Sequence, residues 1–289
     1  MTRDRPDPAP RPFFLERSFA ALWTGQLVSI TGDRLTYLAL GGLLLAHTRL
    51  GTDVRYPTLL ALLGNVMLAP VLLFAPFTGA WVDRWNLKRV LIVSDVLRAA
   101  IVLAVPALYA LTGHTAPVFA LVFLLFTCNV FFLPAKSAIT PEIVPPQHLL
   151  AANALLSLAG IAATAIGALS GWVVDHWGWG AAMRIDALTY LVSVLTLWIV
   201  RYQPHAPRAP RPGITWGGYL HEVGEGWRAV RASAPAALGL LSLGAVWLGG
   251  GFLHVAGNVH IQRAASVVGS IASQPESSKL TPSACGAKS

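Results

Sequence analysis

The chain has 289 residues, of which 55% are hydrophobic and only 12% are charged. A soluble domain carries about 25% charged residues, so this composition excludes a water-soluble globule and indicates an integral membrane protein. The net charge of +8 does not indicate nucleic-acid binding, because the basic residues lie between apolar segments rather than on one polar face. Cys128 lies in an apolar run and Cys285 in a polar tail, so no disulfide framework is predicted.

Seven apolar segments are long enough to cross a bilayer, whose core needs about 20 mainly apolar residues per helix. The expected helices cover residues 19–46, 58–81, 90–111, 117–133, 149–174, 181–200 and 236–259. The seventh contains Gly249-Gly250-Gly251 and is the least regular. The first is too long for the core of a signal peptide, so it is interpreted as a retained membrane helix.

These segments divide the chain into five expected parts. They are a cytoplasmic N-terminal segment (1–17), a six-helix transmembrane bundle (18–200), a cytoplasmic linker (201–232), a seventh transmembrane helix (233–263) and a disordered tail (264–289). The linker contains apolar residues at helical spacing, namely Trp216, Tyr219, Leu220, Val223, Trp227 and Val230. This pattern predicts an amphipathic helix in the headgroup layer, with a helix of a soluble loop as the alternative.

The basic residues indicate the orientation, because loops rich in Lys and Arg stay in the cytoplasm. With a cytoplasmic N-terminus, the inside segments hold 13 Lys and Arg residues, whereas the outside loops between helices hold 3. We therefore expect a multi-pass protein of the cell (plasma or inner) membrane whose N-terminus is cytoplasmic.

A seven-residue pattern occurs twice, 92 residues apart. Residues 79–85 and 171–177 share the order Gly, two variable residues, Val, Asp, Arg or His, and Trp. The first copy joins the expected helices 2 and 3, and the second joins helices 5 and 6. An odd number of helices in each unit inverts the second copy in the membrane, so the pattern predicts an inverted 3+3 repeat. The alternative is that these residues simply cap membrane helices.

The first copy also resembles the signature loop of the major facilitator superfamily of transporters, which reads roughly Gly-x-x-x-Asp-Arg-x-Gly-Arg-Arg. The matching residues are Gly79, Asp83, Arg84, Lys88 and Arg89. Asn86 stands where that loop usually has glycine, and Leu87 stands where it usually has a basic residue. The resemblance implies a gating role for the matching residues and the N-terminal six-helix half of the superfamily's all-α fold.

Two further stretches resemble the enterobactin (siderophore) exporter branch of that superfamily. One runs from Pro134 to Leu155 and the other from Arg184 to Tyr190. The glycine-rich motif of such exporters is incomplete here, since residues 167–171 lack its proline and one glycine. A full member has twelve helices, so the resemblance leads us to expect a chain truncated or frameshifted near Arg263.

Charged and small residues inside the expected helices are the candidate functional residues. Asp33 and Arg34 lie near the middle of the first helix, where a charge usually faces a cavity or a partner. They are expected either to serve coupling or substrate binding, or to form buried ion pairs with other helices. Asp95 and Arg98, spaced i and i+3, are expected to pair in a network with Asp83 and Arg84. A ridge of small residues for helix packing is formed by Ala159, Ala163, Gly167 and Gly171.

Taken together, these features predict a secondary active transporter, an ion-gradient-driven exporter of small molecules, whose form here is of doubtful activity. The alternatives are a transport-incompetent remnant or an accessory membrane subunit, and, less favoured, a seven-helix receptor. The residues show no nucleophile–base pair, phosphate loop or metal-ligand spacing, so we expect no enzyme activity, cofactor or metal. The expected partners are the lipid bilayer, a small-molecule substrate and either a second copy or a complementary half-transporter, with no nucleic acid.

The orientation can be tested by labelling single cysteines from each side of the membrane. A cysteine placed at Asn86 should react only from the cytoplasm, and one placed at Gly113 only from outside, because loops rich in Lys and Arg stay on the cytoplasmic side of the membrane. Reversed labelling would show that the basic residues do not determine the topology of this chain.

Overall fold

A computed structural model describes residues 16–48, 55–82, 84–202, 224–225, 227–242, 244–246 and 249. The helices in the first three ranges are α1 (Arg17–His47), α2 (Arg55–Val82), α3 (Leu87–Thr112), α4 (Ala116–Ile143), the short 3-10 turn η2 (Pro146–His148), α5 (Leu149–Gly167), α6 (Ser170–Trp177) and α7 (Trp179–Ile199). No strand occurs within the described ranges. The prediction of an all-α bundle is therefore confirmed.

Two helix boundaries differ from the sequence-based expectation. Helix α4 continues ten residues past 133, through Pro134 and Pro141, because a membrane helix bonded along the rest of its length tolerates the loss of a donor at a proline. The expected helix at 149–174 is broken instead into α5 and α6. At the break, Ala168 and Leu169 donate to the carbonyls of residues three positions back, at 3.2 and 3.0 Å, so the α-helical register is interrupted without a proline.

This break also alters the predicted ridge of small residues. Ala159, Ala163 and Gly167 are buried on one line of α5, as expected for helix packing. Beyond the break the line passes to Ser170, which is buried, whereas Gly171 is only half-buried. A Cβ at Gly171 would meet nothing within 4 Å, so the part of Gly171 in helix packing stays a prediction.

Five segments of the described chain are long and apolar enough to cross a membrane. They are Thr58–Ala75, Leu87–Thr112, Ala116–Ile143, Pro146–Trp177 and Trp179–Ile199. The first predicted span, now α1, is not among them, although its 31 residues are ample in length. Its composition is more polar because Gln26, Ser29, Asp33 and Thr36 recur along one side. Helix α1 is therefore suited to the interior of a bundle rather than to lipid alone.

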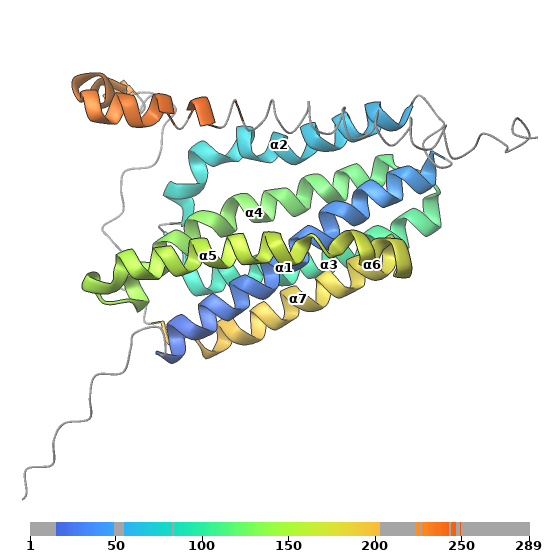
Figure 1. Cartoon of the computed structure of the whole chain (residues 1–289), viewed down its shortest axis with the longest axis horizontal. Coiled ribbons are helices and arrows are strands. Elements are labelled where there is room, and N and C mark those ends of the chain that lie inside the picture. Colours follow the sequence, from blue (N-terminus) through green and yellow to red (C-terminus); the bar gives the residue numbers. More distant parts are fainter. Residues whose placement is uncertain are drawn as a thin grey trace, which may run out of the picture. The chain divides into compact units, whose positions relative to one another are not determined.

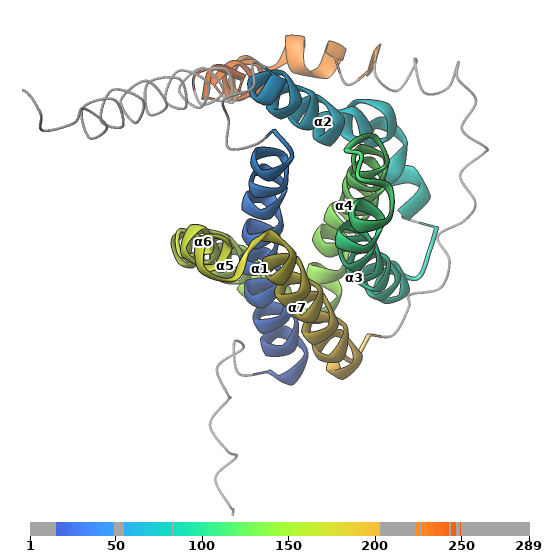
Figure 2. The ribbon, with the colours of Figure 1, turned by 90° about the vertical axis from the view of Figure 1, so that its right-hand side faces the viewer.

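The helices of this bundle pack around α1 and α7 (Figure 2). Helix α1 packs against α7 and α5, α7 also packs against α3, α3 packs against α4, and α4 packs against α2. The face of α1 toward α7 carries small buried residues at heptad-like spacing: Gly25, Ser29, Gly32, Thr36 and Ala39. Small side chains allow two membrane helices to approach closely, which explains why these two make the tightest pair.

The two copies of the repeated pattern lie at opposite ends of the bundle (Figure 1). At one end, the Lys88 ammonium at the start of α3 donates to the carbonyls of Trp198 and Val200 at the end of α7. At the other end, Tyr109 near the end of α3 contacts His47 of α1 and Trp179 of α7. Helices 1–3 and the helices that follow them thus run in the inverted arrangement that the repeat predicted.

The chain divides into two compact units, Met1–Ala209 and Pro210–Ser289. In the second unit the described residues form short helical pieces, including an apolar stretch over Ala234–Val246, and Arg231 lies over the Trp227 ring at 5.5 Å. Residues 216–223 of the predicted amphipathic helix, most of 247–263 and the predicted tail at 264–289 lie outside the described residues.

Close packing of α1 on α7 can be tested at two glycines of α1. A Cβ at Gly32 would lie 2.9 Å from the Cβ of Thr189 and would also collide with the Asp186 carboxylate, whereas a Cβ at Gly41 would meet nothing within 4 Å. We expect Gly32→Ala to destabilise the bundle by about 1–3 kcal/mol and to lower its melting temperature in detergent. Gly41→Ala is the matched control and should be neutral or stabilising by up to about 1 kcal/mol. An unchanged melting temperature for Gly32→Ala would contradict this packing.

Candidate functional site

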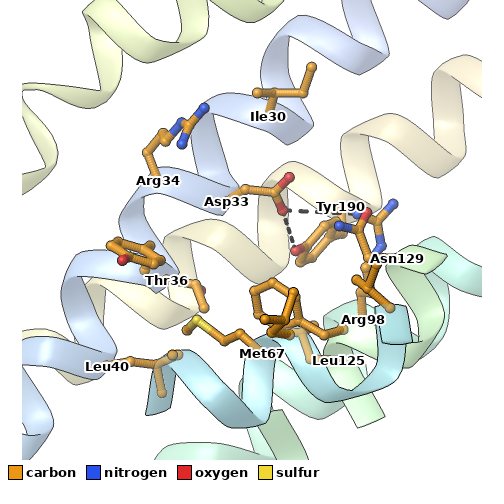
Figure 3. A pocket seen from close by; sticks show the side chains of 15 residues that line it. Ile30, Asp33, Arg34, Thr36, Leu40, Met67, Arg98, Leu125, Asn129 and Tyr190 are labelled. Carbon is orange, nitrogen blue, oxygen red and sulfur yellow. Dashed lines mark hydrogen bonds and ion pairs between the residues drawn. The ribbon is translucent and has the colours of Figure 1, made fainter. Parts of the chain in front are cut away.

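A cavity of about 560 Å³ opens in the first unit beside the middle of α1. Its lining comes from five helices: Ile30, Asp33, Arg34, Thr36, Tyr37, Leu40, Gly64, Met67, Leu68, Val71, Arg98, Leu125, Phe126, Asn129 and Tyr190. Asp33, Asn129 and Tyr190 each lie near the midpoint of their own helix, so the cavity lies about half-way along the bundle. Figure 3 shows these three side chains beside one another in the cavity wall. Most of its wall is apolar, with a small polar group on one side.

Asp33 is the carboxylate of this cavity. Its side chain is 38% exposed, and one oxygen, Oδ1, accepts a hydrogen bond from the Tyr190 hydroxyl at 2.5 Å. The same oxygen lies 3.9 Å from Nη1 of Arg98 (Figure 3). Asp33 thus joins the accessible space to two buried groups on α7 and α3. Such a carboxylate can bind a proton or a cation and alter the contact between helices when it does so.

Arg98 is almost completely buried, with 3% of its side chain exposed. It pairs with Asp95 one turn away on α3, and Asp95 also accepts a hydrogen bond from Ser193 of α7 at 2.7 Å. The guanidinium lies 4.2 Å from the ring centre of Phe132 and 4.7 Å from that of Tyr190. Cation–π contacts of this kind supply part of the solvation that water would otherwise give.

A second buried carboxyl, Asp186 on α7, lies in the same interface. Its two oxygens accept hydrogen bonds from Thr36 of α1 at 2.5 Å and from Thr189 of its own helix at 3.0 Å. The absence of a side chain at Gly32 leaves room for the Asp186 carboxylate, because a Cβ at Gly32 would collide with Oδ1 of Asp186. Asp186 therefore fixes α1 against α7 through hydroxyl donors, one turn from Tyr190.

Arg34 follows Asp33 in sequence but extends in another direction (Figure 3). Its Cγ and Cβ lie 2.6 and 2.7 Å from where a Cβ would stand at Gly167, and its Nη2 donates to the Thr164 hydroxyl at 3.1 Å. Asp33 and Arg34 thus have separate partners on different helices. Whether either serves coupling or substrate binding stays a prediction.

The predicted ion pair of Asp95 and Arg98 is present, but its described contacts run to α1, α4 and α7 rather than to the loop between α2 and α3. Asp83, which the sequence grouped with this pair, lies outside the described residues. Arg84 is exposed in the turn between α2 and α3. The neighbours of the pair are the buried Tyr190 and Ser193 and the partly exposed Asp33, so the network lies deeper in the bundle than the sequence indicated.

The residues of the signature-like loop have distinct surroundings. Gly79 is exposed in the last turns of α2, while the Lys88 ammonium binds the carbonyls of Trp198 at 3.0 Å and Val200 at 2.7 Å. A lysine at this place satisfies carbonyls that the end of α7 leaves unbonded. The Asn86 side chain accepts the backbone N–H of Arg89 at 3.1 Å and caps α3. The residue that departs from the usual glycine therefore has a structural role.

Sequence reasoning missed the contribution of α7 to this site. Asp186, Thr189, Tyr190 and Ser193 recur at spacings of three and four residues, which places polar groups on one side of an apolar helix. A polar stripe inside an expected membrane helix was the signal that could have identified them. The sequence could not show that this polar stripe of α7 contacts α1, because several of the expected helices carry polar side chains.

Removal of the Arg98 charge should test how strongly the network holds the bundle together. Arg98→Gln leaves Asp95 buried without its cation, so we expect a loss of about 3–5 kcal/mol and a clear fall in melting temperature in detergent. Asp95→Asn combined with Arg98→Gln removes both charges and should recover most of that loss. A double variant less stable than Arg98→Gln alone would contradict the pairing.

Comparison with known proteins agrees with this architecture. Residues 22–271 match the Major Facilitator Superfamily. The chain is 27% identical over 232 residues to an uncharacterised MFS-type transporter of Mycobacterium bovis, covering 76% of this chain and 51% of that protein. It is 27% identical over 239 residues to macrolide efflux protein A of Streptococcus pyogenes, covering 80% and 55%. It is 29% identical over 208 residues to the lysophospholipid transporter of Serratia proteamaculans, covering 70% and 46%.

The chain thus spans about half the length of the curated relatives that it matches. The matched region includes the inverted bundle, the signature-like loop and the polar cavity at mid-depth, which together form the N-terminal half of the transporter fold. On these grounds the chain belongs to the Major Facilitator Superfamily.

Proposed function

We propose that this protein is a secondary active transporter that uses an ion gradient to drive the export of small molecules. Asp33 would be the group that couples ion movement to export. The observation that supports this most is the position of Asp33. Its carboxylate is partly accessible from a cavity at mid-depth, yet contacts Tyr190 and Arg98 in the core. Facilitator transporters place substrate and coupling-ion sites near this depth.

The coupling would act through the charge on Asp33. An ionised Asp33 attracts Arg98 of α3 and holds the hydroxyl of Tyr190, which favours a close approach of α1 to α3 and α7. A proton or a bound cation weakens that attraction and favours a different packing of the same helices. The small residues between α1 and α7 permit such a shift without large side chains in the way.

The pathway would be completed by a second six-helix unit facing the cavity. Asp33 and the exposed Arg34 lie at mid-depth on this face. A charge at the centre of a helix costs about 2.5–3.5 kcal/mol against hydrocarbon, so this face needs a cover. The facing unit could be contributed by a longer form of the polypeptide, a second copy or a complementary half-transporter. The protein would lie in the cell (plasma or inner) membrane with its N-terminus in the cytoplasm.

The substrate would be a small amphipathic molecule. Apolar side chains such as Met67, Leu68 and Phe126 line most of the cavity, while Asp33 and Asn129 offer polar contacts. The named relatives handle a macrolide and a lysophospholipid, both of which combine an apolar body with polar groups. The siderophore-exporter branch suggested by residues 134–155 and 184–190 is a narrower form of the same proposal.

Asp33→Asn should separate coupling from binding in inside-out vesicles. Using radiolabelled erythromycin and a fluorescent lysophospholipid as probes, we expect a pH gradient to drive uptake by the unaltered protein and to drive little uptake by the variant, because the variant lacks the ionisable carboxyl. Exchange of internal for external probe without a gradient should persist, because the asparagine still accepts the Tyr190 hydrogen bond.

Asp175→Asn is the matched control, since Asp175 is an exposed carboxylate at the end of α6. It should transport as the unaltered protein does. Full gradient-driven uptake by Asp33→Asn would contradict the coupling role. No uptake by the unaltered protein with either probe would favour the alternative of a transport-incompetent or accessory subunit.

A further inference from the structure

A second cavity, of about 640 Å³, shares no lining residue with the central site. It lies between α3 and α4 beside the turn that joins α2 to α3. Its lining residues are Arg84, Trp85, Asn86, Arg89, Val90, Val93, Ser94, Leu97, Thr127, Cys128 and Phe131. The transport mechanism proposed above makes no use of it.

The polarity of this second cavity changes along its length. Arg84 and Arg89 lie at the end near the turn, where α3 begins. One and two turns further into the membrane-spanning part of α3, the wall includes Val93 and Leu97, which are 55% and 47% exposed, together with the smaller Ser94. Trp85 stacks on Phe131 of α4 at 5.9 Å and forms an aromatic side to the cavity. The cavity therefore offers cations at the membrane surface and apolar contacts below them.

We propose that this second cavity binds an anionic phospholipid. Two guanidinium groups at headgroup depth match a phosphate diester, which arginine binds with charge-assisted hydrogen bonds. Basic pockets between membrane helices bind anionic headgroups in this way. The exposed Val93 and Leu97 would contact the first part of an acyl chain, and a free phosphate ion would leave them uncovered. The combination favours a lipid over a soluble anion.

The neighbouring residue Lys88 provides a built-in comparison. It carries the same charge at the same depth, but its ammonium binds the carbonyls of Trp198 and Val200 at the end of α7. It does not line the second cavity. If lipid binding depended only on the total charge at this end of the protein, removing the charge of Lys88 or of Arg89 would weaken it equally. If the lipid binds in the second cavity, removing the charge of Arg89 should have the larger effect.

Native mass spectrometry of the purified full chain in detergent tests this proposal directly. With equal amounts of phosphatidylglycerol and phosphatidylcholine, we expect retained adducts of phosphatidylglycerol. Arg84→Gln and Arg89→Gln should each weaken that binding about fivefold, since one basic residue near an anionic lipid contributes about 1 kcal/mol. Lys88→Gln should bind as the unaltered protein does. Inorganic phosphate at millimolar concentration should not displace the lipid.

Leu97→Trp is a second variant that keeps every charge and fills the apolar wall. It alters an exposed side chain, so the protein should fold, and it should reduce phosphatidylglycerol adducts as the arginine variants do. Equal retention of both lipids, equal losses in Lys88→Gln and Arg89→Gln, or displacement by phosphate would overturn the proposal. So would unchanged binding by Leu97→Trp, which would show that no acyl chain lies in the cavity.

Discussion

The bundle depends on the burial of one guanidinium, that of Arg98, in the middle of a membrane protein. It pairs with Asp95 on α3, lies near Asp33 of α1, and is covered by the rings of Phe132 and Tyr190 from α4 and α7. A cation at this depth is costly unless protein groups solvate it. Four helices meet at this point because each contributes to that solvation, and the central cavity opens directly beside it.

The position of α1 follows from the same constraint. Its polar side cannot face lipid, so the helix is held in the bundle by Gly25, Gly32 and the hydroxyl of Thr36, which bonds to Asp186. Asp33 lies on the same helix, and its carboxylate lines the cavity. Helix α1 thus packs against α7 and α5 and also brings a carboxylate to the proposed pathway. A change of charge at Asp33 would act on the closest helix contacts of the bundle.

Much of this architecture was accessible from the sequence, because helix length, basic loops and a repeated pattern are local signals. The pair of Asp95 and Arg98 was also predictable, since three residues on one helix bring the two side chains together. The contact of Asp33 with Tyr190 was not, because 157 residues separate them and no local pattern selects one polar partner among several helices. The break after Gly167 was missed for a related reason, since no proline or charge marks it. The continuation of α4 through Pro134 was missed because proline usually ends a helix in water.

The central claim is that the cavity beside Asp33 is a water-filled pathway and not a surface in contact with lipid. Cysteine accessibility tests it most directly, in a protein whose Cys128 and Cys285 are replaced by alanine. Asn129→Cys lines the cavity, whereas Leu188→Cys is an exposed position near the middle of α7 that does not. In native membranes, a membrane-impermeant thiol reagent should label Asn129→Cys and leave Leu188→Cys unlabelled. Equal protection of both cysteines would contradict the account, because it would show that no water reaches the cavity.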